Sequence, residues 1–178
     1  MRDNVWFTYK ARIQAHKRLE WLDLHSQLLL VWYAILGTVL SVVAIKHPKV
    51  FGDDTDVMAT ILSVALLGVS LSVSNRDFRG RAIQMRRNYL GLHQLYRSVP
   101  RDMTLTSNQS VRYDELLNDS ENHREIDDRI ARILASQLTS RHPTVFESIH
   151  VIFWLLSRLV ITIGLYVAPV AFVLIWGI

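Results

Sequence analysis

Residues 28–45 read LLLVWYAILGTVLSVVAI, a run of eighteen residues without a charged side chain. As an α-helix rising about 1.5 Å per residue, this run approaches the roughly 30 Å thickness of the hydrocarbon core of a bilayer. A second uncharged run, VMATILSVALLGVSLSVS, occupies residues 57–74, and the stretch between the two contains Gly52 and three aspartates. The two runs predict a transmembrane helical hairpin over residues 28–74.

A third apolar run, LVITIGLYVAPVAFVLIWGI, occupies residues 159–178. Apolar residues also dominate its approach from Ile149, but Arg158 interrupts them and is expected to lie at the membrane interface or to reach toward it. The sequence thus predicts a C-terminal apolar helix over residues 149–178 that crosses the membrane. Three crossings would place the two ends of the chain on opposite sides.

The composition agrees with a membrane protein. The 178 residues have a mean hydropathy of +0.17, and 20 Lys and Arg against 16 Asp and Glu give a net charge of +4. The absence of cysteine from the sequence excludes a disulfide framework, thiolate catalysis and any cysteine-ligated zinc or iron–sulfur site. Since no segment shows the periodicity of a strand, the predicted fold class is an all-α membrane protein.

The basic residues indicate the orientation of the hairpin. Cationic side chains beside a membrane span resist translocation, whereas acidic ones have little influence. The turn between the first two spans offers only Lys46 and Lys49, beside Asp53, Asp54 and Asp56. Basic residues are concentrated before the first span and after the second: Arg2, Lys10, Arg12, Lys17 and Arg18, then Arg76, Arg79, Arg81, Arg86 and Arg87. The amino terminus and the segment after the hairpin are therefore expected in the cytoplasm.

The cytosolic parts are predicted to be helical as well. Residues 1–27 are typical of an amphipathic basic helix, and residues 75–148 of a region with several helices. Apolar side chains recur after the second span at alternating spacings of four and three, which place them on one helical face: Phe78, Ala82, Met85, Tyr89, Leu92, Tyr96 and Val99. We expect this seam to contact other copies of the chain, on a helix that continues directly out of the second span and ends at Pro100.

Polar residues mark the next helix boundaries. Residues 101–110, RDMTLTSNQS, are predicted to form a linker because they show no periodicity. Asn122 with Glu125, and Thr144 with Glu147, have the spacing of a helix N-cap and its reciprocal partner. The second pair is expected to start the helix that leads into the third apolar run.

One cluster of polar residues could bind a metal ion or catalyse hydrolysis: Asp119, Glu121, Asn122, His123, Asp127 and Asp128. The same residue types favour helix starts, because they accept hydrogen bonds from free backbone N–H groups. We favour the helix start. The sequence therefore predicts no enzyme activity, no catalytic residue, no metal site and no cofactor.

The arginines that follow the second span, from Arg76 to Arg87, could bind nucleic acid or the phosphate of a cyclic nucleotide. Cations just inside a membrane also fix its orientation and contact anionic headgroups. We favour the second role, and direct binding of nucleic acid is not expected.

The spans carry hydroxyl and small side chains on separate faces. Hydroxyl groups of the second span fall near one face and are the expected lining of a pore: Thr60, Ser63, Ser70 and Ser74. Small residues allow helices to approach closely in lipid and are the expected packing positions: Gly37, Ser41, Ala65, Gly68 and Ser72, with Gly164 and Ala168 in the third run. Helix packing is also the alternative for the hydroxyl face, since three spans cannot enclose a pore alone and a water-filled path would need an oligomer.

The order of these segments resembles a known family. A basic helix, YKARIQAHKRLEW, precedes a two-span hairpin, an arginine-led helix, FRGRAIQMRRNYLGLHQLY, and the segment YDELLNDSENHREIDD. This order resembles the SLATT proteins, the SMODS and SLOG-associating two-transmembrane effectors of bacterial conflict systems, and most of all the branch coupled to reverse transcriptases. The resemblance extends to about Arg141 and depends on these residues: Arg18, Leu19, Arg81, Ala82, Asn88, Leu92, Tyr96, Tyr113, Leu117, Glu121, Asn122, His123 and Asp127. The third apolar run departs from the two-span name.

The resemblance implies an effector in the bacterial inner membrane that oligomerises into a pore or membrane-disrupting assembly and kills or arrests a phage-infected cell. It implies a sensor or reverse transcriptase as a partner, besides membrane lipid and further copies of the chain. Six residues are expected to couple the effector to that partner: Arg81, Tyr113, Leu117, Asn122, His123 and Asp127. One alternative is a membrane-anchored scaffold that recruits a polymerase or nucleotide sensor. Another is a holin-like phage protein, which has little use for so long a cytosolic region.

Overall fold

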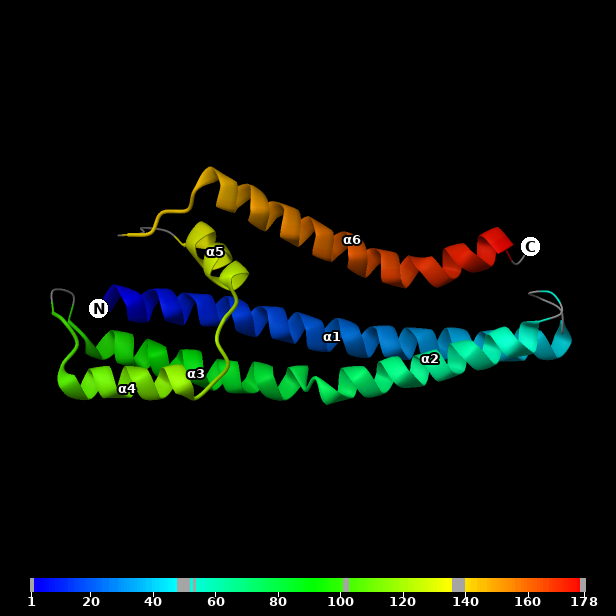
Figure 1. Cartoon of the computed structure of the whole chain (residues 1–178), viewed down its shortest axis with the longest axis horizontal. Helices are drawn as coiled ribbons and strands as arrows, with labels where there is room; N and C mark the ends of the chain where they lie inside the picture. Colours follow the sequence, from blue (N-terminus) through cyan, green and yellow to red (C-terminus); the bar gives the residue numbers. More distant parts are fainter. Residues whose placement is uncertain (1, 48–51, 53, 101–102, 136–139, 177–178) are drawn as a thin grey trace. The chain divides into compact units, whose positions relative to one another are not determined.

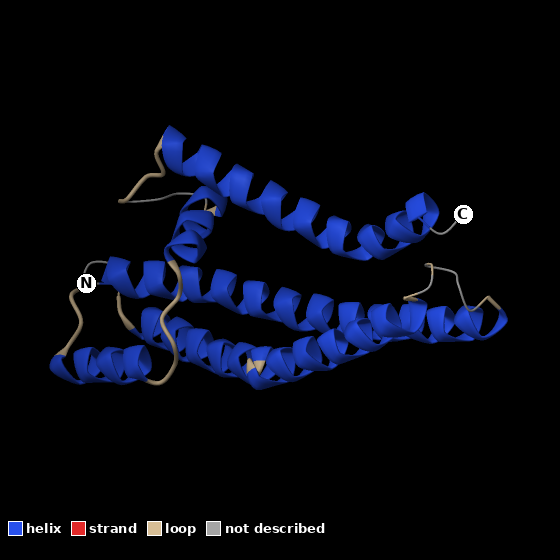
Figure 2. Cartoon of the chain, turned by 45° about the vertical axis from the view of Figure 1, so that its right-hand side comes forward, coloured by secondary structure: helices blue, strands red, loops and turns tan. Residues whose placement is uncertain are grey.

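The computed structural model describes residues 2–47, 52, 54–100, 103–135 and 140–176 (Figure 1). In this part of the chain the regular elements are helices, and no strand occurs (Figure 2). The helices in chain order are α1 (Arg2–Lys46), α2 (Thr55–Asn75), α3 (Phe78–Ser98), α4 (Ser107–Asn118), α5 (Glu125–Leu134) and α6 (Val145–Trp176). Helical stretches within Arg2–Lys46, Thr55–Ser98 and Val145–Ala171 are long and apolar enough to cross a membrane. The predicted all-α membrane fold is confirmed.

The helices gather into two compact units. The polar unit comprises Met1–Leu22 and Phe78–Leu155, and the apolar unit comprises Asp23–Asp77 and Leu156–Ile178. The amino-terminal segment and the segment after the hairpin, which are separate regions in the sequence, therefore share one unit. The long helices α1 and α6 each contribute one part to either unit. Of the hairpin turn, Lys49 and Asp53 lie outside the described residues.

The core of the polar unit forms between α1 and α3, which run antiparallel (Figure 1). Fully buried side chains follow one face of α1 at helical spacings: Val5, Arg12, Ala15 and Leu19. Leu19 packs with Met85 near the start of α3, whereas Val5 packs with Leu92 in its second half. Burying an apolar side chain of this size stabilises the folded state by about 1.5–3 kcal/mol, so this row joins the two helices along the whole unit.

Helix α4 packs against α3 at a glycine. A Cβ atom at Gly91 would lie only 2.8 Å from Cδ2 of Leu116, so a larger residue would require the Leu116 side chain to shift. Helix α4 starts at the N-cap Thr106, whose hydroxyl accepts a hydrogen bond from the Gln109 backbone N–H while the Gln109 side chain accepts one from the Thr106 backbone N–H. The last residues of the predicted linker are therefore helical, because this capping box lies in a polar stretch without apolar periodicity.

The start of α5 differs from the sequence prediction. The pair Asn122 and Glu125 does not cap a helix, because α5 begins at Glu125 after the N-cap residue Arg124. Asp127 accepts a hydrogen bond from the Arg124 backbone N–H at 2.9 Å. The predicted N-cap at Asn122 is therefore wrong, because the N-cap lies two residues later, at Arg124.

The start of α6 confirms the predicted capping box. The Thr144 backbone N–H donates to Oε2 of Glu147 at 2.9 Å, and the Glu147 backbone N–H donates to Oγ1 of Thr144 at 3.2 Å. Glu147 also accepts a hydrogen bond from Nη1 of Arg132 at 3.0 Å. The carboxylate therefore joins the start of α6 to α5 within the polar unit.

A short break separates α2 from α3. Asp77, between the two helices, has a φ angle of 41°, in the left-handed region that side chains other than glycine rarely adopt. The direct continuation of the second span into the next helix, which the sequence suggests, is therefore interrupted at this residue.

In the apolar unit, helix α6 contains a proline. Pro169 has no N–H group, so the carbonyl of Leu165, four residues earlier, loses its intrahelical donor. Tyr33 of α1 donates a hydrogen bond from its hydroxyl to this carbonyl at 2.9 Å, and Trp32 donates from Nε1 to the carbonyl of Tyr166 at 3.1 Å. Backbone carbonyls in lipid require such donors, because no water is present to replace them. The first and third apolar helices are therefore joined by hydrogen bonds to the backbone of α6.

Candidate functional site

Arg12 lies at the centre of the polar unit and is fully buried. Its guanidinium donates hydrogen bonds to Oδ1 of Asn88, to the carbonyl oxygens of Leu116 at 2.8 Å and Leu117 at 3.2 Å, and to Oγ of Ser120 at 2.9 Å. The last carbonyls of a helix have no intrahelical donor. Arg12 therefore satisfies the end of α4 and joins it to α1 and α3.

Two further arginines form ion pairs with a carboxylate of α5 and with one of the segment between α4 and α5. Arg18 of α1 pairs with Asp127, its Nε 3.0 Å from Oδ1 and its Nη2 3.1 Å from Oδ2, and both side chains are almost fully buried. Arg81 of α3 pairs with Glu121 nearer the surface, with Nε 3.1 Å from Oε2 and Nη2 2.9 Å from Oε1. Paired hydrogen bonds of this kind fix orientation as well as distance. We call Arg12, Arg18 and Arg81 the arginine clamp.

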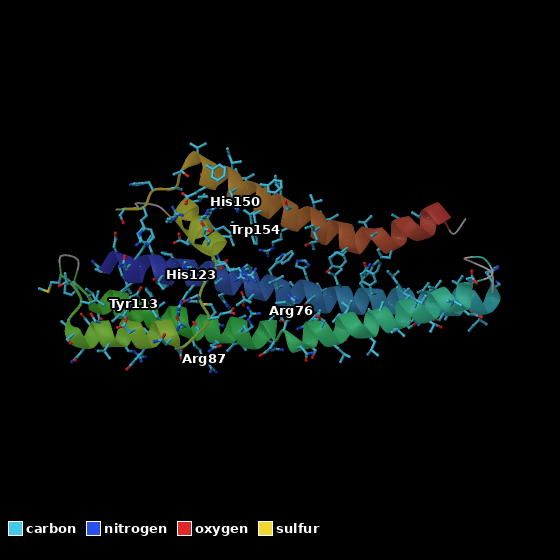
Figure 3. All side chains as sticks on the ribbon, in the orientation of Figure 1. Arg76, Arg87, Tyr113, His123, His150 and Trp154 are labelled. Atoms are coloured by element: carbon cyan, nitrogen blue, oxygen red, sulfur yellow. The ribbon has the colours of Figure 1, made fainter. Side chains whose placement is uncertain are left out.

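His123 lies in the connection between α4 and α5 (Figure 3), and it is close enough to Arg12 of the arginine clamp to interact with its charge. The side chain is half-buried, and its Nδ1 atom has no hydrogen-bond partner among the residues that the structure describes. Burial lowers the pKa of His123, Arg12 lowers it further, and Asp128 and Asp127 oppose this change. The imidazole is therefore neutral at pH 7.

The acidic cluster considered as a metal or hydrolytic site is paired with arginines. Asp127 and Glu121 contact the arginine clamp, and Oδ2 of Asp128 lies 3.0 Å from Nε of Arg132. Within the described ranges, no group of three or more His, Asp or Glu side chains could hold a metal ion. Asp127 thus joins α5 to α1, Glu121 joins the connection before α5 to α3, and Asp128 pairs within α5.

Most residues expected to couple the chain to a partner lie inside the polar unit. Asp127 is fully buried, and the Tyr113 hydroxyl shares a hydrogen bond of 2.9 Å with Oγ1 of Thr8. Asn122, in contrast, is exposed. Arg81 belongs to the arginine clamp, and Leu117 and His123 contact or adjoin it. Asp127 is thus closed to direct contact, whereas Asn122 is accessible at the surface.

The predicted seam on α3 forms the core of the polar unit. Six of its seven residues lie in apolar clusters or ring contacts with side chains of α1: Phe78, Ala82, Met85, Tyr89, Leu92 and Tyr96. The seventh, Val99, is also buried. Met85 is 1% exposed and Leu92 is 0% exposed. The contact that the sequence suggested between copies is thus a contact within one chain, because α1 offers a matching face. A second copy could reach these residues only if α1 moved away.

The outer side of α3 carries arginines that form no ion pair with any described residue. We call this surface the basic face, and it consists of Arg79, Ile83, Arg86, Arg87, Leu90 and Arg97. The arginines are exposed, Ile83 and Leu90 are each 46% exposed, and Arg87 extends away from α1 in Figure 3. The arginines of the polar unit are thus divided between internal pairs, such as Arg81 with Glu121, and an open face.

The hydroxyl face of α2 lies on the surface of the apolar unit. Thr60 and Ser63 are exposed, and their hydroxyls donate to carbonyls of their own helix, those of Asp56 at 2.8 Å and Ala59 at 2.9 Å. The two other predicted lining residues lie on the same side at helical spacing: Ser70 and Ser74. Because the hydroxyls of Thr60 and Ser63 are satisfied by the backbone, this face is compatible with lipid as well as with water.

The small-residue positions do not pack closely within one chain. Apart from the adjoining residues and backbone of its own helix, no described atom lies within 4 Å of a Cβ position built on Gly37, Gly68 or Gly164. Exposed or half-exposed small side chains accompany them: Ser41, Ala65, Ser72 and Ala168. These surfaces are therefore open to lipid or to another copy of the chain.

Two features of the structure have no counterpart in the sequence predictions. Arg12 lies seven residues after Val5 and seven before Leu19, so the three share one face of α1. The burial of Arg12 follows from this spacing only once α3 is known to cover that face. Pro169 identifies Leu165 as a carbonyl that needs a donor. The sequence does not show that Tyr33 is that donor, because the two residues lie on different helices.

Comparison with known proteins identifies the family of the chain. No curated protein and no solved structure matches it. The sequence model of the SMODS and SLOG-associating 2TM effector domain family 5 matches residues 1–176. The match does not identify the branch coupled to reverse transcriptases, but it includes the third apolar helix, which the resemblance stated above leaves outside. All six helices are therefore parts of one family domain, and the chain belongs to the SMODS and SLOG-associating 2TM effector domain family 5.

Proposed function

We propose that the chain is the membrane effector of a bacterial anti-phage defence system and that several copies assemble into a pore or a membrane-disrupting structure. Membership of the effector family and three helices able to cross a membrane support a membrane effector. Four points go beyond this support and are part of the proposal. They are the assembly of several copies, the death or growth arrest of the infected cell, the location in the inner membrane, and a cytoplasmic amino terminus.

The observation that supports a pore best is the open hydroxyl face of α2. In a single chain, Thr60 and Ser63 lie at the surface. In an assembly with α2 turned inward, the same face would surround a common path, and its hydroxyls could turn from backbone carbonyls to water or ions. Gly68, on the other side of α2, has open space around it and would allow a neighbouring helix to approach closely.

The proposed activity needs no catalysis by this chain. The carboxylates of the polar cluster are engaged by arginines, as with Asp127 and Arg18, which favours a structural role for them. A sensor or reverse transcriptase encoded nearby is the proposed source of the activating signal, and the polar unit is the proposed receiver.

A membrane-anchored scaffold is a second candidate, favoured by the basic face of α3. Arginines around exposed aliphatic side chains, here Ile83 and Leu90, are typical of protein interfaces. Such a surface would bind an acidic patch on a polymerase or nucleotide sensor. In this alternative the spans only hold the chain at the membrane.

The experiment compares two substitutions at the same positions of α2. The double variant Ser63→Leu with Ser70→Leu would close the path with apolar side chains, whereas Ser63→Ala with Ser70→Ala keeps small side chains there and is the matched control. Cells that express the variants with the neighbouring defence genes are challenged with phage. A voltage-sensitive dye reports membrane potential, and the amount of inserted protein is measured by immunoblotting.

Wild type and the alanine variant should depolarise the cell, and the leucine variant should not, at equal amounts of inserted protein. Growth arrest by the wild type with an intact potential would contradict the pore. The scaffold predicts that result, with full activity of the leucine variant and loss of activity in Arg86→Glu with Arg87→Glu.

A further inference from the structure

The first three turns of α6, which belong to the polar unit, expose an apolar face. Its side chains are between 57% and 79% exposed although all are large and apolar: Val145, Phe146, Ile149, Ile152 and Phe153. The spacing places them on one side of the helix. A contiguous surface of this kind is rare in contact with water and marks a site of interaction.

The opposite side of the same turns faces the polar unit. Val151 is only 4% exposed, and Glu147 bonds to Arg132 of α5 and to its own capping partner Thr144. The exposed apolar face is therefore directed away from the core of the unit. Covering it requires something outside this unit.

The same face continues into the membrane-spanning part of α6. Exposed apolar side chains follow on the same side of the helix: Leu156, Leu159, Val160 and Ile163. The helix has 32 residues and is about 48 Å long, whereas a hydrocarbon core is roughly 30 Å thick. The excess corresponds to about twelve residues at 1.5 Å each, which is close to the length of the exposed first turns.

We propose that α6 tilts in the bilayer, so that residues 145–155 lie in the headgroup region with their apolar face against the upper acyl chains. The polar unit then has a lipid contact of its own, as an interfacial amphipathic helix has. The polar side chains agree with this placement, because Glu147 and Arg158 both lie on the side of α6 opposite the apolar face. Arg158, expected from the sequence to interrupt the apolar segment, leaves the lipid-facing side unbroken.

Lipid is the inferred partner because this face continues, with the same apolar composition, the exposed side of a helix that is long and apolar enough to cross a membrane. The positions on this side of the helix, from Val145 to Ile163, contain no polar side chain that would fix the register of a second protein surface. Acyl chains require no such register. The inference holds for a pore and for a scaffold alike.

The absence of native cysteine allows a direct test with single-cysteine variants of the full chain. Phe146→Cys, Ile149→Cys and Phe153→Cys place a label on the apolar face, and Glu125→Cys, on the exposed side of α5, is the matched control. Each variant is labelled with an environment-sensitive fluorophore and reconstituted into vesicles of phosphatidylethanolamine and phosphatidylglycerol. Nitroxide groups on the lipid tails quench labels in the membrane, and iodide quenches labels in water.

The three labels on the apolar face should emit at shorter wavelength than the control and should be quenched by the lipid nitroxide but not by iodide. Quenching by iodide to the extent seen at Glu125→Cys would overturn the proposal, because the face would then lie in water. Protection from both quenchers, together with energy transfer between labelled copies, would overturn it in favour of a second copy. Ile149→Cys is the smallest change of the three and decides the result if either phenylalanine variant fails to insert.

Discussion

Arg12 occupies a position where the surrounding row of α1 is apolar. A buried guanidinium loses its hydration, and the contacts it gains in the folded state offset that cost only when its donors are satisfied. Here the two terminal nitrogens of the guanidinium reach Asn88 and the last carbonyls of α4, including that of Leu116, whereas Nε has no partner among the described residues. A shift of α1 along α3 by two turns would place the charge against apolar side chains. We therefore expect Arg12 to fix the register of the two helices more than it adds to their stability.

Replacing Arg12 by methionine should destabilise the polar unit by about 3 kcal/mol, because Oδ1 of Asn88 and the carbonyl of Leu117 would lose their donor. The carbonyl of Leu116, in contrast, keeps the side-chain N–H of Asn88. Arg79→Met, the same substitution on the basic face, is the matched control and should change stability by about 0.5 kcal/mol or less. Urea unfolding of the purified chain in mild detergent, followed by protease sensitivity of α4, measures the difference. Equal effects of the two substitutions would show that the clamp does not hold α4.

At the scale of the helices, α1 supplies the hydrogen-bond donor that α6 lacks at its proline. The Tyr33 hydroxyl replaces the backbone donor that Pro169 cannot supply to Leu165. A hydrogen bond between membrane helices contributes about 0.6 kcal/mol on average and up to about 1.7 kcal/mol. The hydrogen bond between Tyr33 and Leu165 should contribute near the upper end of this range, since the Leu165 carbonyl has no donor within its own helix.

A double-mutant cycle isolates this contact. Tyr33→Phe should cost about 1.5 kcal/mol in the wild-type background. In the Pro169→Ala background, residue 169 again donates to the Leu165 carbonyl, so Tyr33→Phe should cost almost nothing. Unfolding in mixed micelles with increasing dodecyl sulfate, monitored by circular dichroism, gives the four stabilities. An equal cost in both backgrounds would mean that Tyr33 does not compensate for the proline.

The helices differ in how far their sequences predict them. The apolar runs follow from local composition, and so does the seam of α3, where Met85 and Leu92 repeat at heptad spacing. The surface that covers this seam could not be predicted, because Arg12 interrupts the complementary row of α1 and gives that segment the pattern of a basic, solvent-exposed helix. The capping box of α4 was missed for a similar reason, since its neighbours carry no apolar stripe to reveal a helix. Periodicity detects a face, but it does not identify the partner of that face.

For the whole molecule, the distribution of Lys and Arg predicts a cytoplasmic polar unit. Asp54→Cys and Ser107→Cys, one in the hairpin turn and one at the start of α4, can be labelled with a membrane-impermeant maleimide in intact spheroplasts. Asp54→Cys should react before lysis, and Ser107→Cys only after it. The reverse pattern would invert the topology, and with it the side from which a sensor could act.

Helix α1 is continuous from Arg2 to Lys46, contains no proline, and has Gly37 as its only glycine. Sharp kinks in helices arise at prolines, glycines and inserted groups, so the sequence gives no cause for a kink between Arg12 and Tyr33. Arg12 and Tyr33 are about six turns apart, at about 3.6 residues per turn, and belong to the polar and the apolar unit respectively. The buried hydrogen bonds of Arg12 and the contact of Tyr33 with α6 are therefore made from one uninterrupted helix, with no loop between them.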